Sequence, residues 1–107
     1  PFIAAINSMP IIKDKIKLHI CNGILGLYDG GPMPKKRHVW SNNGIILSKD
    51  PVALDTIGMH IIEGKRKERE LSSLFNRPNL PKHIETAGRY GLGVSDLNLI
   101  NHKTVLI

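Results

Sequence analysis

The chain has 107 residues, a length that favours one domain, residues 1–107, with one modest hydrophobic core. Its 41% hydrophobic and 22% charged content is ordinary for a soluble globular protein, and no run approaches the roughly 18 apolar residues of a membrane helix. The single cysteine, Cys21, excludes an internal disulfide, an all-cysteine zinc site and an iron–sulfur cluster held by this segment alone.

The net charge of +6 would suit an anionic partner, but the basic residues are concentrated in three short runs, KDKIK, KKRH and KRKER. A surface that stacks single-stranded nucleic acid interleaves basic with aromatic side chains, and only one aromatic residue, Trp40, lies near a basic run. None of the standard nucleic-acid-binding motifs is present. We therefore interpret the basic runs as solvated surface and expect no nucleic-acid partner.

The first part of the chain predicts a helix, a strand and a loop. Residues 2–12 favour a short helix that ends at Pro10, since proline disfavours the helical conformation of the residue before it. Apolar and polar residues alternate over 16–21, which is the pattern of a strand, and Asn22–Gly23 is typical of a hairpin turn. Glycines and prolines make residues 29–38 a loop.

A strand and a capped helix follow the loop. The run GIILS, residues 44–48, predicts a strand that is buried on both faces. Asp50 is a typical helix N-cap, and Pro51 suits the first helical position because its missing N–H has no partner there. The helix is expected to run to about Glu63 and to stop at Gly64.

Two more helices and two strands are predicted for the rest of the chain. Residues 65–75 fit a helix with one apolar face, and another begins at Pro81 and ends near Tyr90, with Gly91 as a left-handed cap. The closing runs LNLIN and TVLI favour strands. This alternation predicts an α/β fold, a mixed sheet with helices packed against it in two or three layers.

One acidic residue, Asp55, falls on the apolar face of the helix that follows Pro51. At about 100° per residue it lies between Ile62 and Met59. Because an unpaired buried carboxylate is unfavourable, we expect Asp55 to be turned inward and neutralised. Its partner could be the backbone N–H groups of a neighbouring loop, a buried lysine or arginine, or a metal or substrate in a cleft.

Three segments, GLYDGGP, SKDPVALDTIG and AGRYGLG, resemble in this order the C-terminal part of the family catalogued as domain of unknown function 362. The resemblance spans residues 26–93. The family pattern has a Gly-Gly-Pro or Gly-Pro loop, a helix that begins Asp-Pro-Val-Ala-x-Asp after a short apolar strand, and a later helix that ends in Gly-Leu-Gly. The matching residues are Gly30, Gly31, Pro32, Asp50, Pro51, Val52, Ala53, Asp55, Gly91, Leu92 and Gly93.

The resemblance implies an α/β architecture and a longer chain, of which this sequence is the C-terminal portion. It disfavours the hairpin turn at Asn22–Gly23. Where the family is expected to have aspartate, this chain has Asn22, which would weaken a metal site but keep a hydrogen-bonding role. Members of the family often carry ferredoxin-type iron–sulfur segments or accompany redox proteins, and export is found among them. The resemblance therefore implies no cofactor within this segment, an iron–sulfur cluster in the remainder of the chain, and a cytoplasmic location unless an N-terminal signal directs export.

The strand, the glycine loop and the helix start predict one candidate site, because open α/β sheets bind ligands where a strand end meets a helix start. Its predicted ligand-binding residues are Asn22, Asp29, Gly30, Gly31, Asp50 and Asp55. Their carboxylates suit a hard cation such as magnesium, but the spacing matches no known metal loop, so we assign no metal. The neighbouring basic residues Lys35, Lys36 and Arg37 are candidates for binding an anion or the acidic surface of a partner protein.

The sequence names no reaction, and two functions stay open. One is the C-terminal portion of a redox- or iron–sulfur-associated α/β protein with a ligand or cation site near the Gly-Gly-Pro loop and the helix that follows Pro51. The other is a non-enzymatic module that binds a small anion or a protein through residues 30–36.

Overall fold

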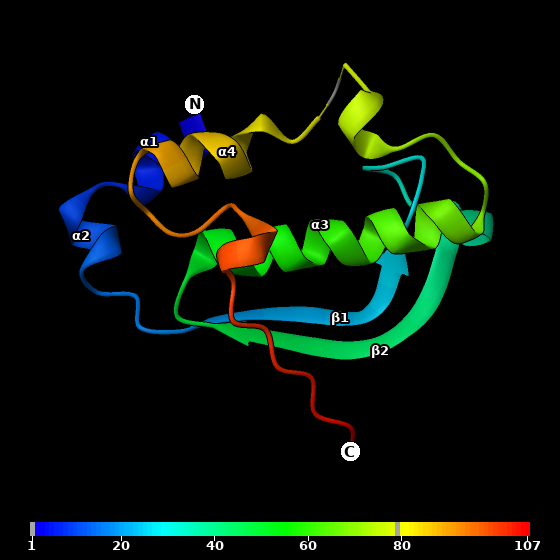
Figure 1. The fold of residues 1–107 in the computed structure, drawn as a ribbon, viewed down its shortest axis with the longest axis horizontal. Helices are drawn as coiled ribbons and strands as arrows, with labels where there is room; N and C mark the ends of the chain where they lie inside the picture. The colour runs from blue at the N-terminus through cyan, green and yellow to red at the C-terminus, as the bar shows by residue number, and fades with distance from the viewer. Residues whose placement is uncertain (1, 79) are drawn as a thin grey trace.

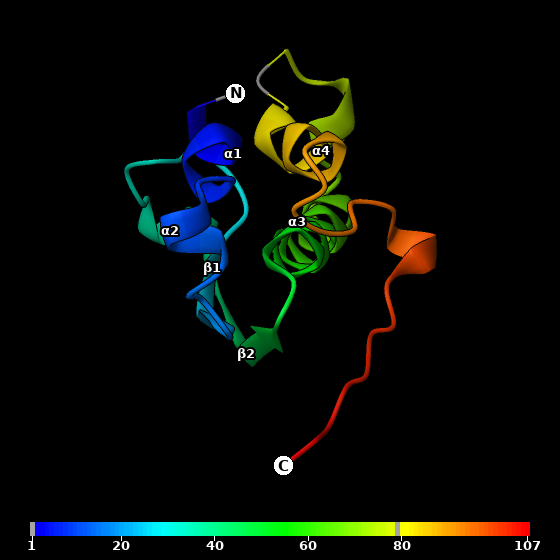
Figure 2. The ribbon, with the colours of Figure 1, turned by 90° about the vertical axis from the view of Figure 1, so that its left-hand side faces the viewer.

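The computed structural model of the protein describes residues 2–78 and 80–107, and all its helices lie on one side of a small sheet (Figures 1 and 2). The elements are α1 (Phe2–Asn7), α2 (Pro10–Lys13), β1 (His19–Leu27), β2 (Val39–Ser48), α3 (Pro51–Glu68) and α4 (Lys82–Arg89), with short 3-10 turns at Lys36–His38, Leu74–Asn76 and Leu97–Leu99. The long helix α3 packs on the sheet, and α1 and α4 lie beyond it. The predicted α/β class is confirmed, with a sheet of two antiparallel strands.

The two strands pair from His19 opposite Ser48 to Leu27 opposite Val39, and a bulge interrupts the pairing. The bulge on β2 includes Asn43, whose φ of 56° is in the left-handed region that asparagine tolerates better than most residues. The Asn22–Gly23 turn that the sequence predicted is wrong, because both residues lie inside β1, and β2 begins five residues before the predicted 44.

Beyond the bulge, Gly26 makes room for an aromatic ring. A Cβ at this position would lie 2.2 Å from carbons of the Trp40 ring, so the indole packs directly on the backbone of β1. The ring of Tyr28 lies 6.2 Å from that of Trp40. The strands bend at this end, and Tyr28 and the loop after it reach the C-terminal half of α3 (Figure 1).

Helix α3 starts as predicted and ends later than predicted. Asp50 is its N-cap and Pro51 its first residue, but Gly64 lies within the helix, which continues to Glu68. It ends in a Schellman motif, in which Leu71 N–H donates to the Arg66 carbonyl at 3.0 Å and Glu70 takes a left-handed φ of 55°. The predicted separate helix over 65–75 is therefore wrong.

The left-handed residue that ends α3 is a glutamate, so we expect Glu70→Gly to raise the free energy of unfolding by about 0.5–1 kcal/mol. Glycine removes the clash of Cβ with the backbone at positive φ, and it keeps the two hydrogen bonds of the motif. Urea denaturation followed by circular dichroism measures the change. Gly64→Ala is the matched control. Gly64 has a helical backbone and open space around it, so replacing this glycine by alanine should stabilise the protein by a similar amount. A lower midpoint for Glu70→Gly would contradict the assignment of this cap.

The two ends of the chain differ from prediction in different ways. Pro10 does not end one helix but begins a second, α2, after the break at Ser8 and Met9. Near the C-terminus, the predicted helix is confirmed as α4, and Gly91 has a φ of 70° in its Schellman cap. The predicted strands LNLIN and TVLI are wrong, because the first contains a 3-10 turn and the second runs without helix or strand.

The core is small and surrounds the first half of α3. Its buried hydrophobic residues are Ala4, Tyr28, Val52, Ala53, Leu54, Ile57 and Ile84. Six of these, all except Tyr28, come from the helices α1, α3 and α4. Within the described ranges, no helix combines the length and the apolar character that a bilayer crossing requires.

Candidate functional site

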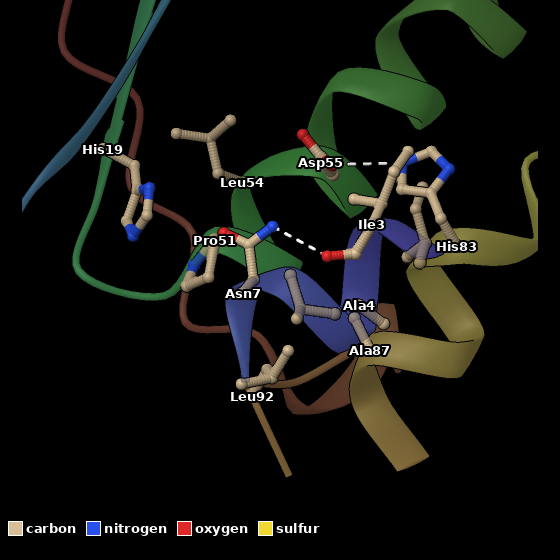
Figure 3. Close-up of a pocket in the computed structure, with 12 residues that line it drawn as sticks. Ile3, Ala4, Asn7, His19, Pro51, Leu54, Asp55, His83, Ala87 and Leu92 are labelled. Atoms are coloured by element: carbon tan, nitrogen blue, oxygen red, sulfur yellow. Dashed lines mark hydrogen bonds and ion pairs between the residues drawn. The ribbon is translucent and has the colours of Figure 1, made fainter. Parts of the chain in front are cut away.

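A pocket of about 190 Å³ opens where α1, the start of α3 and α4 meet (Figure 3). Its walls are mostly apolar and its polar groups lie at the sides. The lining residues are Ile3, Ala4, Asn7, His19, Pro51, Val52, Leu54, Asp55, His83, Ile84, Ala87 and Leu92. Side chains from four segments that are distant in the sequence thus line one space.

Asp55 lies beside this pocket and is not buried. Its side chain is 51% exposed, and its Oδ2 lies 3.2 Å from Nε2 of His83, which is 32% exposed. The prediction that Asp55 is turned inward is wrong, because α1 and α4 leave this part of the α3 surface uncovered. Its partner is a histidine of α4, and none of the three partners that the sequence left open.

The carboxylate gives the pocket its charge. Among the lining residues, Asp55 is the one acidic side chain. Asn7 Nδ2 donates to the Ile3 carbonyl of its own helix at 2.9 Å, which fixes the direction of the amide at the pocket wall (Figure 3). An apolar space with one carboxylate and two imidazoles at its edge favours a ligand that carries a hydrogen-bond donor or a positive charge.

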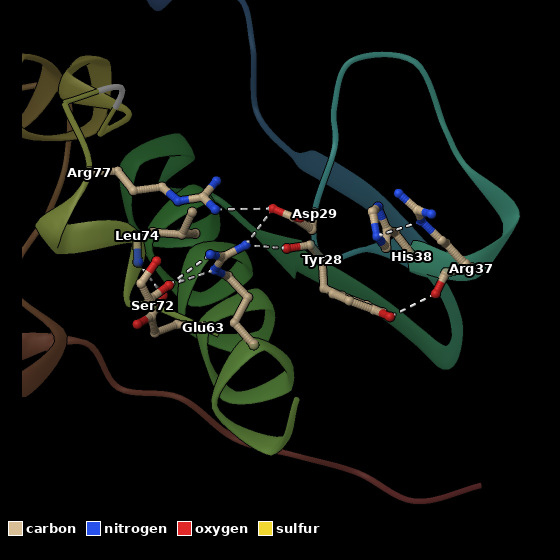
Figure 4. Close-up of polar contacts among 9 residues, drawn as sticks. Tyr28, Asp29, Arg37, His38, Glu63, Ser72, Leu74 and Arg77 are labelled. Carbon is tan, nitrogen blue, oxygen red and sulfur yellow. Dashed lines mark hydrogen bonds and ion pairs between the residues drawn. The ribbon is translucent and has the colours of Figure 1, made fainter. Parts of the chain in front are cut away.

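The other end of α3 holds a polar cluster that includes Tyr28, Asp29 and Ser72 (Figure 4). Arg66 is 0% exposed, and its guanidinium makes four hydrogen bonds. Nη1 donates to the Tyr28 carbonyl at 2.7 Å and to Asp29 Oδ1 at 2.9 Å, while Nε and Nη2 donate to the Ser72 carbonyl at 3.2 and 2.7 Å. Arg66 thus joins the loop after β1 to the turn that follows α3.

Two guanidinium groups lie against Asp29: Arg66 donates a hydrogen bond to it, and Arg77 forms an ion pair with it. Arg77 Nη2 lies 3.3 Å from the same Oδ1 that Arg66 contacts, and the Arg77 side chain is 41% exposed. The hydrogen bond from Arg66 lowers the pKa of Asp29 below its usual value, and this effect exceeds the opposing effect of partial burial. Asp29 is therefore ionised and held in place by protein groups.

Asp50 is also held by protein groups. Its Oδ1 accepts from the N–H groups of Val52 and Ala53, both at 2.8 Å, and its Oδ2 accepts from the N–H of Val94 at 2.8 Å. Gly93 lies so close that any Cβ there would overlap the carboxylate. Asp50 therefore fastens the segment after α4 to the start of α3, and it joins two of the three motifs of the predicted resemblance.

The structure divides the predicted site between the two ends of α3. Asp29 contacts Arg66, which is 11 residues after Asp55 and therefore about 16 Å further along the helix axis. Asn22 lies on the exposed face of the sheet, and its Oδ1 accepts from Ile24 N–H. Of the predicted ligand-binding residues, Asp50 and Asp55 share the pocket end of α3, and only Asp55 lines the pocket.

The remaining predicted residues lie in the loop between the strands. Gly30, Gly31, Lys35, Lys36 and Arg37 are all exposed, and they are near Asp29 in the chain but not near the pocket. Within residues 2–78 and 80–107, no three histidine, cysteine or acidic side chains are grouped so that they could hold a metal ion. The carboxylates that the sequence suggested for a hard cation thus do not converge.

Sequence reasoning missed Arg66 and His83. Arg66 was assigned to a solvated basic run, although helical geometry rotates it only about 20° from Asp55, onto the face that the apolar residues share. Extending the predicted helix beyond Gly64 would have placed Arg66 on this face. No local signal marks His83, because its role depends on how α4 packs against α3.

Comparisons of the chain with protein-family models, with curated proteins and with solved structures found no match. The resemblance to domain of unknown function 362 therefore stays a prediction made from three motifs.

Proposed function

We propose that the protein binds a small molecule in the pocket between α1, α3 and α4, as part of a redox- or iron–sulfur-associated α/β protein. The observation that carries the binding proposal is the apolar space edged by Asp55 and His83. The redox association rests on the motif resemblance alone. An upstream coding sequence with Cys-x-x-Cys-x-x-Cys spacing would support it, and a full-length chain without such cysteines would count against it.

The size and charge of the pocket indicate the class of ligand. Its 190 Å³ is slightly more than the roughly 150 Å³ of an engineered apolar cavity that holds one benzene ring. The apolar walls favour a hydrocarbon body, and Asp55 favours an amine or another donor at its edge. A single-ring amine fits these requirements, and a single-ring carboxylate of the same size does not.

A titration followed by ¹H–¹⁵N NMR tests this proposal with cyclohexylamine and cyclohexanecarboxylate as probes. The amine is expected to shift the amide signals of residues 52–55 and 83–87, and the carboxylate to shift them at least fivefold less at equal concentration. Asp55→Asn should weaken amine binding about fivefold, because an ion pair at a half-exposed site contributes about 1 kcal/mol.

Glu85→Gln is the matched control for that titration. It removes one negative charge from the exposed side of α4, where Glu85 pairs with Arg89 and does not line the pocket. Amine binding should be unchanged. Equal binding of both probes, or no shift with either, would reject the pocket as a site for this class of ligand.

The loop between the strands supports a second candidate, the binding of an anion or an acidic protein surface. The exposed Lys35, Lys36 and Arg37 stand together in this loop. Inorganic phosphate is the probe, and Lys35→Glu combined with Lys36→Glu should abolish any shift in melting temperature that phosphate produces. Unaltered phosphate binding by this double variant would exclude the loop as the phosphate-binding site.

A further inference from the structure

A histidine at the end of the loop between the strands has a hydrogen-bond donor that no other group uses. Nδ1 of His38 is buried and has no hydrogen-bond partner among the described residues. The other ring nitrogen, Nε2, accepts from Arg37 Nε at 3.2 Å (Figure 4). Because arginine can only donate, Nε2 carries no hydrogen in this contact, and the ring hydrogen is therefore assigned to Nδ1. A buried N–H without an acceptor is unfavourable, and a bound ligand would supply the missing acceptor.

The imidazole that carries this donor is held in place by its neighbours. The His38 N–H donates to the Lys35 carbonyl at 2.8 Å, and the His38 carbonyl accepts from the Tyr28 N–H at 3.0 Å. The ring of Tyr28 packs against the imidazole with centroids 5.5 Å apart, and its hydroxyl donates to the Arg37 carbonyl at 2.7 Å. Tyr28 is itself buried, and its carbonyl accepts from Arg66. The unused donor is thus preorganised, which lowers the entropy that a ligand would lose on binding it.

Gly30 keeps one side of the imidazole free of a side chain. A Cβ at this position would lie 2.9 Å from His38 Nδ1 and 4.0 Å from Lys35 Cδ, so the unused donor and the lysine stem lie on either side of the same point. The φ of Gly30 is 74°, in the left-handed region that suits glycine. Lys35 is exposed, and exposed side chains change rotamer within nanoseconds. Its ammonium group can therefore turn over Gly30 and meet the same acceptor as Nδ1–H.

The charges of the loop select an anion as that acceptor. Residues 35–37 are three consecutive basic side chains, and all are exposed. The one acidic residue of the loop, Asp29, is already paired with Arg66 and Arg77, at 2.9 and 3.3 Å. The backbone N–H groups of residues 30–31 donate to no backbone carbonyl within the described ranges. Several cationic groups together suit a phosphate with up to two negative charges better than a carboxylate with one.

We propose that this loop binds a phosphate group, with His38 Nδ1–H as the buried donor and Lys35 as the cation that closes over Gly30. The proposal rests on the second candidate function, the binding of an anion by residues 35–37, and it names the ligand and the donor that recognises it. The phosphate belongs to a free phosphate ion or to a phosphate ester. Arg37 is a positioning residue, because its donation to Nε2 keeps the hydrogen on Nδ1.

An NMR titration near neutral pH tests the proposal with inorganic phosphate and glycerol 3-phosphate as probes. The two probes distinguish a free phosphate from a phosphate ester, and acetate at the same ionic strength is the comparison for a carboxylate. We expect at least one of the two phosphates to shift the ring ¹⁵N signals of His38 and the amide signals of residues 35–38. Acetate should bind about tenfold more weakly.

Three variants locate the donor. His38→Phe keeps a ring against Tyr28 but removes Nδ1–H, so it should weaken phosphate binding about tenfold, the effect of losing one hydrogen bond to a charged group. His38→Asn should restore most of the binding, because the asparagine amide can place an N–H near the position of Nδ1. His102→Phe is the matched control, since it removes an exposed histidine of the C-terminal segment and should leave phosphate binding unchanged.

The outcomes separate this proposal from the function on which it rests. If neither phosphate binds, or if Lys35→Glu combined with Lys36→Glu leaves binding unaltered, the loop is rejected as an anion site altogether. Loss of binding in that double variant together with full binding by His38→Phe overturns only the role of His38. Circular dichroism shows whether His38→Phe is folded. If it is unfolded, the original chain decides, because a phosphate that binds without shifting the Nδ1 signal does not use this donor. Acetate that binds as tightly as phosphate overturns the choice of ligand.

Discussion

Replacing Arg66 by methionine is expected to lower the free energy of unfolding by about 3–5 kcal/mol, the usual effect of removing one partner of a buried ion pair. Methionine fills a similar volume, but it leaves the Asp29 carboxylate and the carbonyls of Tyr28 and Ser72 without the donors that satisfy them. Urea denaturation at neutral pH, followed by tryptophan fluorescence from Trp40, measures the change.

Arg77→Met is the matched control for this prediction. Arg77 contacts the same Asp29 oxygen as Arg66 but is 41% exposed, so its loss should cost about 1 kcal/mol or less. Both substitutions remove a guanidinium from the same Asp29 oxygen, but only Arg66→Met also leaves the carbonyls of Tyr28 and Ser72 without donors. The difference between the two variants therefore measures the contribution of the buried position and its additional hydrogen bonds. Equal losses would contradict the account of Arg66 as a buried structural centre.

The pH dependence of stability follows from the lowered pKa of Asp29. A carboxylate whose pKa is lower in the folded state stabilises the protein above its unfolded pKa, and this contribution is lost as the pH falls through the folded pKa. Since the hydrogen bond from Arg66 is the largest cause of the lowered pKa, Arg66→Met removes most of this contribution. The difference in stability between the variant and the original chain should therefore shrink as the pH falls from about 5 to about 2.

Comparing the predicted with the observed positions of Asp29 and Asp55 shows how far the sequence could predict the site. The helical position of Asp55 predicted an inward-facing carboxylate, and this was wrong, because its side chain is half exposed. A carboxylate paired with a buried cation does occur in the structure, but between Asp29 and Arg66. The pattern of one helix does not reveal which part of its surface its neighbours leave open. Asp55 faces the space between α1 and α4, and that space depends on the packing of three helices that are distant in the sequence, with Asp55 and His83 separated by 28 residues.

Three single-residue signals were predicted correctly, whereas Pro10 and Gly64 do not end the helices that they were expected to end. Asp50 and Pro51 begin α3, and Gly91 ends α4, because capping depends on the conformation of one or two residues. The length of the β1–β2 hairpin could not be predicted from single residues. Asn22–Gly23 has the composition of a turn, but pairing with β2 and the bulge at Asn43 keep the chain extended through it.

Asp50→Ala is expected to lower the free energy of unfolding by about 2–4 kcal/mol. The loss combines a helix cap, which contributes about 1 kcal/mol, with an unsatisfied N–H at Val94, which costs about 1–3 kcal/mol. Urea denaturation measures it. Asp96→Ala is the matched control, because Asp96 caps only the 3-10 turn at Leu97–Leu99 and is exposed, so its loss should cost about 1 kcal/mol or less.

Asp50→Ser separates the two functions of this carboxylate. The serine hydroxyl can cap α3, but it cannot also accept from Val94 N–H, so this variant should lose only about 1–2 kcal/mol. Leu92 lines the pocket two residues before Val94, and the tether to Asp50 fixes this segment against the start of α3. Asp50→Ser should therefore weaken the binding of cyclohexylamine while α3 stays folded. A serine variant as stable as the original chain would show that the tether contributes nothing beyond the cap.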